Sequence, residues 1–331
     1  MQSALFRIKR LSVVLTRTSA KTLTSSHVLS GSIMKKQVKA IIPVLDYELH
    51  KGQMGRIGVV GGSPVYTGAP YFAGIAALRV GADLSYVFCC KEAAVVIKSY
   101  SPDLIVLPLL DHKDALGQIS EWLPRLHSIV IGPGLGRDPA ILENVKGIIM
   151  QSMERNIPVI IDADGLFLIT EQPEIVQGYG KAILTPNIVE FERLYSKVIG
   201  HPLDKSISAE DNTKELSEAM GHVTIVQKGP QDIITNGYKT LICDNPKGCP
   251  RRCGGQGDIL SGAMGTFQHW ANMAMNKPVV NETGPALVGA YAACQLTRSV
   301  AHWTFSDKGR SMMTSDMIDY LSKIRIDSCW Q

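Results

Sequence analysis

The sequence predicts an α/β fold built around one mostly parallel β-sheet. From about residue 53 onward, short apolar runs alternate with longer helical segments, the pattern of strands joined by right-handed crossover helices. Several of these runs are unbroken Val, Ile and Leu, as expected for strands that are buried on both faces of a parallel sheet. Near the C-terminus the pattern changes to a hairpin and long helices. We therefore expect a three-layer α/β/α sandwich with an antiparallel hairpin extension.

The strands and helices of the parallel part can be assigned in chain order. The predicted strands are Arg56–Val60, Leu84–Phe88, Leu104–Leu107, Ser128–Ile131, Val159–Ile161, Ala182–Leu184 and Thr224–Val226. The predicted helices between them are Tyr71–Val80, Ala93–Tyr100, Ala115–Leu123, Pro139–Glu154 and Asn187–Tyr195.

The hairpin follows the last of these strands. Asp232–Thr235 and Thr240–Cys243 flank Asn236-Gly237, a pair that favours a type I′ turn. Two or three long helices complete the chain, and their predicted ranges are Asp258–Met273, Pro285–Trp303 and Thr314–Arg325. No Pro/Ser-rich linker and no internal repeat interrupts the pattern, so residues 34–331 are expected to form a single domain.

Residues 1–33 have a different composition. They contain five basic residues, no Asp or Glu, and many Ser and Thr, and six apolar residues between Leu5 and Leu15 are spaced roughly as one helical face. This composition is typical of a mitochondrial or plastid transit peptide, and the alternative is a disordered basic tail. Met34 follows directly and would serve as a second start that gives a cytosolic form.

The leader also accounts for the net charge of +4, which arises from 34 basic and 30 acidic residues. Without the five basic residues of 1–33, 29 basic residues face 30 acidic ones, so the remaining chain is close to neutral. A near-neutral body without a basic stripe disfavours nucleic acid as a partner. No stretch approaches the roughly 18 apolar residues of a membrane span, so we expect a soluble protein without a membrane partner.

The seven cysteines have no regular spacing, which argues against a disulfide framework and favours a reducing compartment. Cys249 and Cys253 form a close pair, but no second pair and no pair of histidines accompanies them. A zinc site is therefore disfavoured.

Five of the predicted strands end in loops that are rich in glycine or polar residues. Ligands of open α/β sheets bind at the carboxyl ends of the strands, where glycine allows close approach of the backbone. Each loop alone is ordinary turn chemistry, but together they predict a groove for a large polar ligand. The loops contain Gly61-Gly62-Ser63-Pro64, Gly132-Pro133-Gly134-Leu135-Gly136, Asp162-Ala163-Asp164-Gly165, Thr185-Pro186-Asn187 and Lys228-Gly229-Pro230.

Two common nucleotide-binding motifs are absent from the sequence. There is no G-x-x-x-x-G-K-[ST] segment, and Arg137 occupies the third glycine position of a G-x-G-x-x-G motif that would begin at Gly132. A P-loop protein and a Rossmann dehydrogenase are therefore both disfavoured.

The segment Gly254-Gly255-Gln256-Gly257-Asp258 leads directly into an apolar helix. Free N–H groups and the helix dipole at such a start form a site for phosphate oxygens. In the first turn, Asp258 would reach a substrate hydroxyl and act as its general base, and the alternative is a helix cap. Arg251 and Arg252 precede the glycines and would contact a polyphosphate, unless they form a solvated basic loop.

This glycine-aspartate segment resembles the phosphoryl-transfer motif of the ribokinase-like superfamily. The other loops occur in the same order as in one branch of it, the ATP-dependent NAD(P)H-hydrate dehydratase family, and the resemblance extends over roughly residues 40–325. It implies a ribokinase-like fold. Gln256 departs from bacterial relatives, which usually carry a small residue such as Thr there, and resembles the eukaryotic form, which implies ATP rather than ADP as donor.

The resemblance implies site residues in several loops and at the starts of two helices. Asp258 is the implied catalytic base, Glu190 is linked to Mg²⁺ directly or through water unless it is a solvated helix residue, and Gly61–Gly68 closes over the substrate. The implied ATP-binding residues are Lys228, Gly229, Pro230, Gln231, Asp232, Gly248, Cys249, Pro250, Arg251, Arg252, Cys253, Gly254, Gly255, Gln256 and Gly257. The implied substrate-binding residues, beside Asp258, are Gly136, Asn187, Ile188, Val189, Glu190, Phe191, Glu192 and Arg193.

The resemblance also implies a reaction. ATP would phosphorylate the hydroxyl of an NADH or NADPH hydrate, and loss of phosphate would restore the dihydronicotinamide. It implies Mg²⁺ as cofactor and an NAD(P)H-hydrate epimerase as functional partner. Whether the protein forms a homo-oligomer stays open. Two alternatives stay open, namely a ribokinase-like kinase with a stable phosphorylated product, such as a vitamin precursor or sugar, and a catalytically silent nucleotide-binding or scaffold protein.

Overall fold

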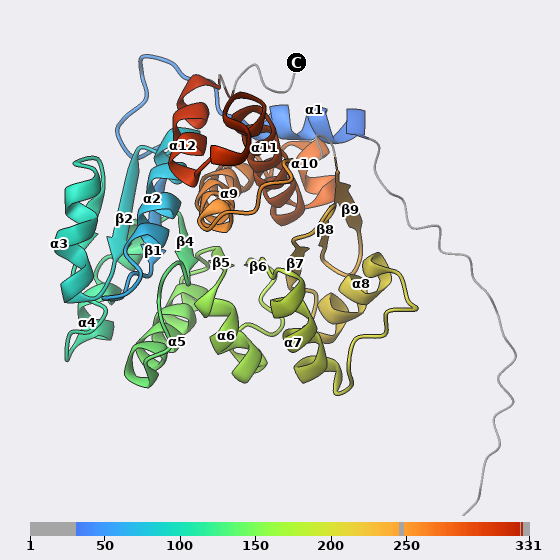
Figure 1. Cartoon of the computed structure of the whole chain (residues 1–331), viewed down its shortest axis with the longest axis horizontal. Helices are drawn as coiled ribbons and strands as arrows, with labels where there is room; N and C mark the ends of the chain where they lie inside the picture. The colour runs from blue at the N-terminus through green and yellow to red at the C-terminus, as the bar shows by residue number, and fades with distance from the viewer. Residues whose placement is uncertain (1–30, 245–247, 325, 327–331) are drawn as a thin grey trace, which may run out of the picture.

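A computed structural model describes residues 31–244, 248–324 and 326 (Figure 1). Most of the predicted leader, residues 1–30, lies outside the described residues. Within the described part of the chain, no helix has both the length and the apolar character needed to cross a membrane.

One nine-stranded sheet forms the centre of the molecule, with the order β3-β2-β1-β4-β5-β6-β7-β8-β9. The strands from β3 to β7 are parallel, whereas β8 and β9 are antiparallel additions at one edge. Seven predicted strands coincide in full with observed ones, β3 begins one residue later than predicted and β7 ends one residue later. The strands are β1 (Arg56–Val60), β2 (Leu84–Phe88), β3 (Ile105–Leu107), β4 (Ser128–Ile131), β5 (Val159–Ile161), β6 (Ala182–Leu184), β7 (Thr224–Gln227), β8 (Asp232–Thr235) and β9 (Thr240–Cys243).

Helices cover both faces of this sheet, which confirms the predicted three-layer α/β/α sandwich. In the view of Figure 1, α9, α10 and α11 lie above the sheet and α5, α6 and α7 lie below it. The helices are α1 (Gly31–Ile41), α2 (Gly68–Val80), α3 (Lys91–Tyr100), α4 (Ala115–Ser120), α5 (Pro139–Glu154), α6 (Asp164–Glu171), α7 (Ile188–Ile199), α8 (Ala209–Ala219), α9 (Gln256–Met273), α10 (Pro278–Thr283), α11 (Pro285–Lys308) and α12 (Thr314–Lys323), with short 3₁₀ turns at Leu123–Arg125, Pro173–Ile175 and Gly309–Ser311.

Alternate side chains of the parallel strands point to the two helical layers. On β4, Val130 packs into the core shared with α2, α9 and α11, whereas Ile129 and Ile131 pack into the core shared with α5, α6 and α7. This two-sided burial explains why the strands are continuous apolar runs.

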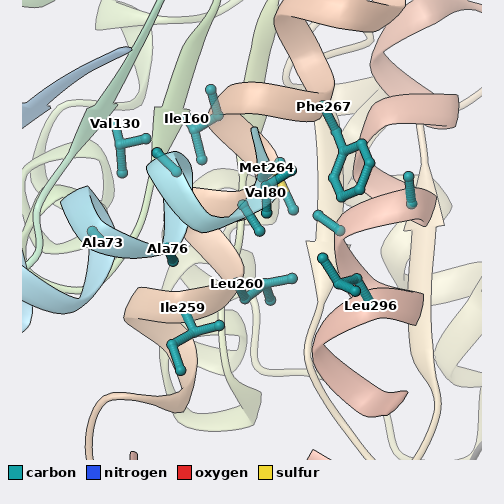
Figure 2. Packing of buried hydrophobic residues seen from close by; sticks show 14 of the residues in the cluster. Ala73, Ala76, Val80, Val130, Ile160, Ile259, Leu260, Met264, Phe267 and Leu296 are labelled. Atoms are coloured by element: carbon teal, nitrogen blue, oxygen red, sulfur yellow. The ribbon is translucent and has the colours of Figure 1, made fainter. Parts of the chain in front are cut away.

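Helix α9 lies in the middle of the upper layer, and every residue from Ile259 to Ala271 is buried. Figure 2 shows Ile259 and Met264 of this helix close to Ala76 and Val80 of α2. The two helices approach so closely at Gly262 that a Cβ there would lie 2.0 Å from the Ala73 carbonyl oxygen. Tight packing on the sheet therefore fixes where the N-terminus of α9 lies.

The turn between β8 and β9 differs from the predicted type I′ turn. A type I′ turn needs positive φ at both central residues, but of Asn236 and Gly237 only Gly237 has it, with φ +80°. The pairing of Thr235 with Thr240 leaves a four-residue loop, in which the Asn236 side chain accepts from the Tyr238 and Lys239 N–H groups. The hairpin prediction was correct and the turn type was wrong, because this Asx contact replaces the tight two-residue turn.

Four helices were not predicted: α1, α6, α8 and α10. Helix α8 has a low apolar content, and α6 begins inside the Asp162-Ala163-Asp164-Gly165 motif, which was interpreted only as a loop. Helix α1 lies next to the basic leader, yet Met34, Val38 and Ile41 are buried in the core. These helices therefore form because of their contacts with the rest of the protein, and the spacing of apolar residues in the sequence does not predict them.

Candidate active site

The five loops that the sequence analysis singled out meet at one edge of the sheet. They follow β1, β4, β5, β6 and β7, which are consecutive in the sheet and parallel. A cavity of about 1060 Å³ lies at this edge, between the loop after β7 and the N-terminus of α9. The volume is at the upper end of the range for small-molecule sites, so the cavity is large enough for a nucleotide and part of a second ligand.

The start of α9 forms one wall of this cavity. Gly254, Gly255, Gln256, Gly257 and Asp258 all line it. Gly255 is the N-cap and has φ +96°, and the first hydrogen bond of the helix runs from the Ile259 N–H to its carbonyl. Among the described residues, no group accepts a hydrogen bond from the N–H groups of residues 254–258. These free donors form an anion-binding site of the kind that the sequence predicted.

The loop is supported from the far side by Thr314, the first residue of α12. Its hydroxyl donates to the Gly254 carbonyl over 2.5 Å. A Cβ on Gly255 would lie 2.8 Å from the Thr314 methyl group and 2.9 Å from the Phe72 ring. The positive φ and the crowded space both require glycine at position 255.

Asp258 lies at the centre of the site and is partly buried. Its carboxylate makes no hydrogen bond with any of the described residues, so it does not cap α9. Burial, together with the nearby Asp162 carboxylate, raises the pKa of Asp258 to about 7, against the opposing effect of Lys228. A carboxyl group with this pKa and no bonding partner is suited to accept a proton at neutral pH.

Lys228 and Asp162 form an ion pair beside Asp258. The Lys228 Nζ lies 2.7 Å from Asp162 Oδ1, and the two side chains are 21% and 3% exposed. A Cβ on Gly257 would lie 3.5 Å from both Lys228 Nζ and Asp162 Oδ2, so the pair faces the anion-binding loop. Burial alone would lower the pKa of Lys228, but the neighbouring carboxylates of Asp162 and Glu190 outweigh it and raise the pKa. Lys228 is therefore a fixed positive charge in the cavity.

Arg298 on α11 holds the loop after β7. Its Nε lies 2.8 Å from Asp232 Oδ2, and its guanidinium donates to the carbonyls of Gly229 and Pro230 over 3.0 and 2.7 Å. The Gly229 N–H donates to Asp232 Oδ1 over 3.1 Å. Asp232, which the sequence assigned to ATP binding, thus has its carboxylate engaged in shaping this loop.

A second hollow of about 210 Å³ adjoins the large cavity, with Asn187 and Glu190 lining both. These two residues form a capping box at the start of α7: the Asn187 side chain accepts from the Val189 and Glu190 N–H groups, and Glu190 Oε2 accepts from the Asn187 N–H over 2.8 Å. Burial raises the pKa of Glu190, although Lys228 and this hydrogen bond oppose the shift. Arg137, Asp164, Val189 and Arg193 line the smaller hollow as well.

The remaining predicted residues lie around these two spaces rather than in them. Phe191 is fully buried in the core, Glu192 pairs with Lys205 at 3.2 Å, and Pro250 is exposed. The Arg251 Nε donates to the Met312 carbonyl, and the Gly136 N–H donates to Asp164 Oδ2. The ranges that the sequence assigned to ATP and substrate binding therefore include residues whose side chains do not face the cavity and instead pack in the core or lie on the surface.

The loop after β1 is tied to the loop after β4. The Gly62 N–H donates to the carbonyls of Pro133 and Gly134, both over 3.1 Å. Val65 and Tyr66 at its tip remain exposed. Closure of Gly61–Gly68 over a substrate stays a prediction.

Three residues of the site were missed in the sequence. Asp162 belongs to a motif that was noted, but no role was given to its side chain. Arg298 is a charged residue in a mostly apolar stretch of α11, a pattern that could have singled out the residue but not its contacts. Thr314 carried no local pattern, because only the fold brings it to the glycine loop.

Comparison with known proteins identifies the family. The family model described as NAD(P)H-hydrate dehydratase matches residues 57–323. The ATP-dependent (S)-NAD(P)H-hydrate dehydratase of Rattus norvegicus is 56% identical over 281 residues, which cover 85% of this chain and 81% of that protein. The Homo sapiens protein of the same name is also 56% identical, over 85% of this chain and 80% of that protein. The chain belongs to the NAD(P)H-hydrate dehydratase family.

Solved structures agree with this family fold. An ADP/ATP-dependent NAD(P)H-hydrate dehydratase from Bacillus subtilis, co-crystallised with ATP/Mg²⁺, has a TM-score of 0.66 at 22% identity, over 87% of this chain and 95% of that chain. A ribokinase-like superfamily protein from Enterococcus faecalis has a TM-score of 0.70 at 20% identity, over 87% and 93%. At these identities the likeness shows the ribokinase-like fold, as predicted.

Proposed function

We propose that this protein catalyses the ATP-dependent dehydration of (S)-NADH and (S)-NADPH hydrates to NADH and NADPH. The observation that carries the proposal is the Asp258 carboxylate, which has no partner among the described residues and lies at the end of a row of free backbone N–H groups. A general base beside an anion-binding loop is the arrangement that phosphoryl transfer to a hydroxyl requires.

In the proposed mechanism, Asp258 takes the proton of the hydrate hydroxyl while the oxygen of that hydroxyl attacks the γ-phosphorus of ATP. The bond from phosphorus to the ADP oxygen breaks, and the N–H groups of residues 254–257 stabilise charge on the transferring group. The carbon–oxygen bond of the phosphorylated hydrate then breaks, phosphate leaves, and loss of a proton from the ring restores the dihydronicotinamide. Phosphorylation is needed because hydroxide is a poor leaving group at neutral pH.

The residues of the cavity fit Mg²⁺ as a cofactor that is held mainly by phosphate. Among the described residues, no cluster of three or more acidic, His or Cys side chains could hold a metal alone. Mg²⁺ in such sites keeps several waters and takes one or two carboxylates besides phosphate oxygens, and Glu190 at the cavity wall would supply one. When bound, the ion would neutralise charge on the phosphates.

The direct test measures recovery of NADH absorbance when the protein meets the (S)-hydrate and ATP. The proposal predicts recovery that depends on ATP, with release of ADP and phosphate. A stable-product kinase would instead accumulate a phosphorylated compound, and a silent protein would leave ATP intact with every substrate. Absence of recovery with folded protein would reject the dehydratase function.

We also propose a functional link to an NAD(P)H-hydrate epimerase, because an enzyme selective for the S hydrate leaves the other epimer unrepaired. No direct contact is implied, and homo-oligomerisation stays a prediction.

For localisation we propose mitochondrial or plastid targeting through residues 1–33, with a cytosolic form starting at Met34. Imaging of tagged chains that begin at Met1 and at Met34 tests this, and identical distributions would contradict it.

The rate is expected to depend on pH through Asp258. A general base must be deprotonated, and burial together with Asp162 raises the pKa of Asp258 to about 7, so kcat/KM should rise with pH through that value. Asp162→Asn removes a nearby negative charge, and the rising limb should move to lower pH. The measurement is the pH profile of kcat/KM for wild type and variant.

Asp164→Asn is the matched control for this profile. Asp164 lies two residues from Asp162 and hydrogen-bonds to Gly136 and Arg137, but it does not contribute to the shifted pKa of Asp258. In Asp164→Asn, kcat/KM should rise at the same pH as in the wild type. An equal shift of this pH in both variants would mean that the rise does not report the protonation of Asp258.

Thr314 is expected to act as a positioning residue for the glycine loop. Thr314→Val keeps the shape of the side chain but removes the hydroxyl that donates to Gly254, and loss of one such bond should lower kcat/KM for ATP by about tenfold. Thr314→Ser retains the donor and should restore most of the activity. Thr304→Val, which removes a buried hydroxyl bond elsewhere, is the control and should alter thermal stability only.

A further inference from the structure

Two cysteines of the anion-binding loop share one amide donor. Gln256 Nε2 lies 3.7 Å from Cys249 Sγ and 3.4 Å from Cys253 Sγ, and it also donates to the Arg251 carbonyl over 3.2 Å. Both sulfur atoms are therefore within hydrogen-bond reach of a single nitrogen.

Both thiols already have defined hydrogen-bond partners. The Cys249 S–H donates to the Arg251 carbonyl over 3.1 Å. Cys253 Sγ lies 3.6 Å from the Thr314 hydroxyl oxygen, whose own proton goes to the Gly254 carbonyl, so the Cys253 S–H is the donor. Cys249, Cys253 and Gln256 all line the large cavity, so a small reagent can reach the part-exposed Cys253 from solvent.

The other described cysteines are in different surroundings. Cys89, Cys90, Cys243 and Cys294 are buried, as is Cys249, whereas Cys253 is partly exposed. Burial raises the pKa of the Cys89 thiol to about 12 and of the Cys90 thiol to about 11, and it also raises the pKa of the Cys294 thiol well above its usual value. Reactive cysteines are typically part-exposed and close to N–H donors or basic groups, and Cys253, which follows Arg252, fits that description.

We propose that Cys249 and Cys253 form a thiol modification site that is oxidised by peroxide to an intramolecular disulfide, and that this oxidation closes the anion-binding loop to ATP.

The chemistry proceeds in two steps. The Cys253 sulfur attacks the peroxide, its S–O bond forms as the O–O bond breaks, and water leaves, so that the thiol is oxidised to a sulfenic acid. The Cys249 sulfur then attacks the oxidised sulfur, the S–S bond forms, the S–O bond breaks, and the hydroxyl leaves with the Cys249 proton as a second water. Overall, two thiols lose two hydrogen atoms and one peroxide becomes two waters.

The disulfide would disturb the loop because both thiol protons are lost. The Cys249 sulfur can no longer donate to the Arg251 carbonyl, and the Cys253 sulfur can no longer donate to the Thr314 hydroxyl. The two sulfurs also have to come within about 2.05 Å of each other, which draws residues 249 and 253 together. Gln256 is the first residue of α9, and Gly254 and Gly255 lie between it and Cys253. A shift of these residues would move the N–H groups that face the cavity. Conversely, bound ATP would cover the thiols and protect them.

The experiment treats reduced, full-length protein with hydrogen peroxide, then measures intact mass, maps the disulfide by peptide mass spectrometry and assays activity. The proposal predicts loss of two hydrogen atoms at the Cys249/Cys253 pair, and a fall in activity of about 100-fold, the scale seen when one oxyanion donor is lost. ATP should slow both changes, and dithiothreitol should reverse both.

Variants distinguish this site from general oxidation. Cys249→Ser and Cys253→Ser are each compared with their own untreated samples, and neither should form the disulfide or show reversible inactivation. Cys294→Ser, which changes a buried cysteine on the same cavity, should behave as wild type. Reversible inactivation that persists in both single variants, or a disulfide at another pair, would overturn the proposal. A disulfide that forms without loss of activity would overturn the effect on ATP binding.

Discussion

Asp258→Asn is expected to lower the rate of hydrate dehydration by about 10²–10⁴-fold, the range that a positioned general base contributes. The amide has nearly the same shape as the carboxylate but cannot take the hydroxyl proton. Because the ATP phosphates are expected to contact backbone N–H groups rather than this side chain, the Kd for ATP should change little. The rate is measured by NADH recovery and the Kd by calorimetry.

Asp211→Asn is the matched control for this variant. Asp211 also lies in the first turn of a helix, but it is exposed and hydrogen-bonds to Ser208 at the start of α8. Its loss should leave the dehydration rate unchanged. Near-normal turnover of Asp258→Asn would remove Asp258 from the role of base and would return it to a structural one.

Lys228→Met is expected to reduce both stability and turnover. The substitution leaves the Asp162 carboxylate, 3% exposed, without its ion-pair partner, and loss of one member of a buried pair costs about 3–5 kcal/mol in the free energy of unfolding. The pair faces an open cavity, so the lower end of that range is expected. Turnover should fall because a fixed positive charge beside the anion-binding loop is lost. Denaturant unfolding and the dehydration assay measure the two effects.

The double variant Asp162→Asn/Lys228→Met separates these two effects. With both charges removed, most of the stability should return, whereas turnover should stay low because the cation is still missing. Lys205→Met is the control, since Lys205 and Glu192 are 80% and 38% exposed and such a pair contributes about 0–1 kcal/mol. A Lys228→Met protein as stable as the Lys205→Met protein would show that the Lys228–Asp162 pair is not a structural element.

Lys228 also affects the protonation of Asp258. Its positive charge lowers the pKa of that carboxyl, whereas Asp162 raises it. In Lys228→Met the rising limb of the pH profile should therefore move to higher pH, opposite to the shift expected for Asp162→Asn. Opposite displacements would link both side chains to the same titrating group.

Much of the fold could be predicted because its elements depend on local pattern. The parallel strands are buried on both faces, so they appear as unbroken apolar runs such as Ile129–Ile131 and Ile160–Ile161. Helices α1 and α8 could not be found in this way. Their stability depends on a few buried contacts, such as those of Met34 and Leu216, that only the folded domain provides.

In the candidate site, too, some residues could be predicted from local sequence and others could not. Gly255 and Asp258 could be identified from sequence because the chemistry of an anion-binding helix start needs those residue types at that spacing. The roles of Asp162, Arg298 and Thr314 could not be identified, because each side chain acts on a segment 60 to 69 positions away along the chain. The contacts are those of Thr314 with Gly254, Asp162 with Lys228 and Arg298 with Gly229.

The sequence alone determined the class of fold, the order of its strands along the chain, and the glycine-aspartate segment at the start of α9. These features depend on residue type and short-range spacing. Only the tertiary structure decided which carboxylate is left without a partner, which cation faces it, and which two thiols share the Gln256 amide. Those properties depend on burial and on distances between distant segments, and the packing of α9 against α2 and the sheet sets them.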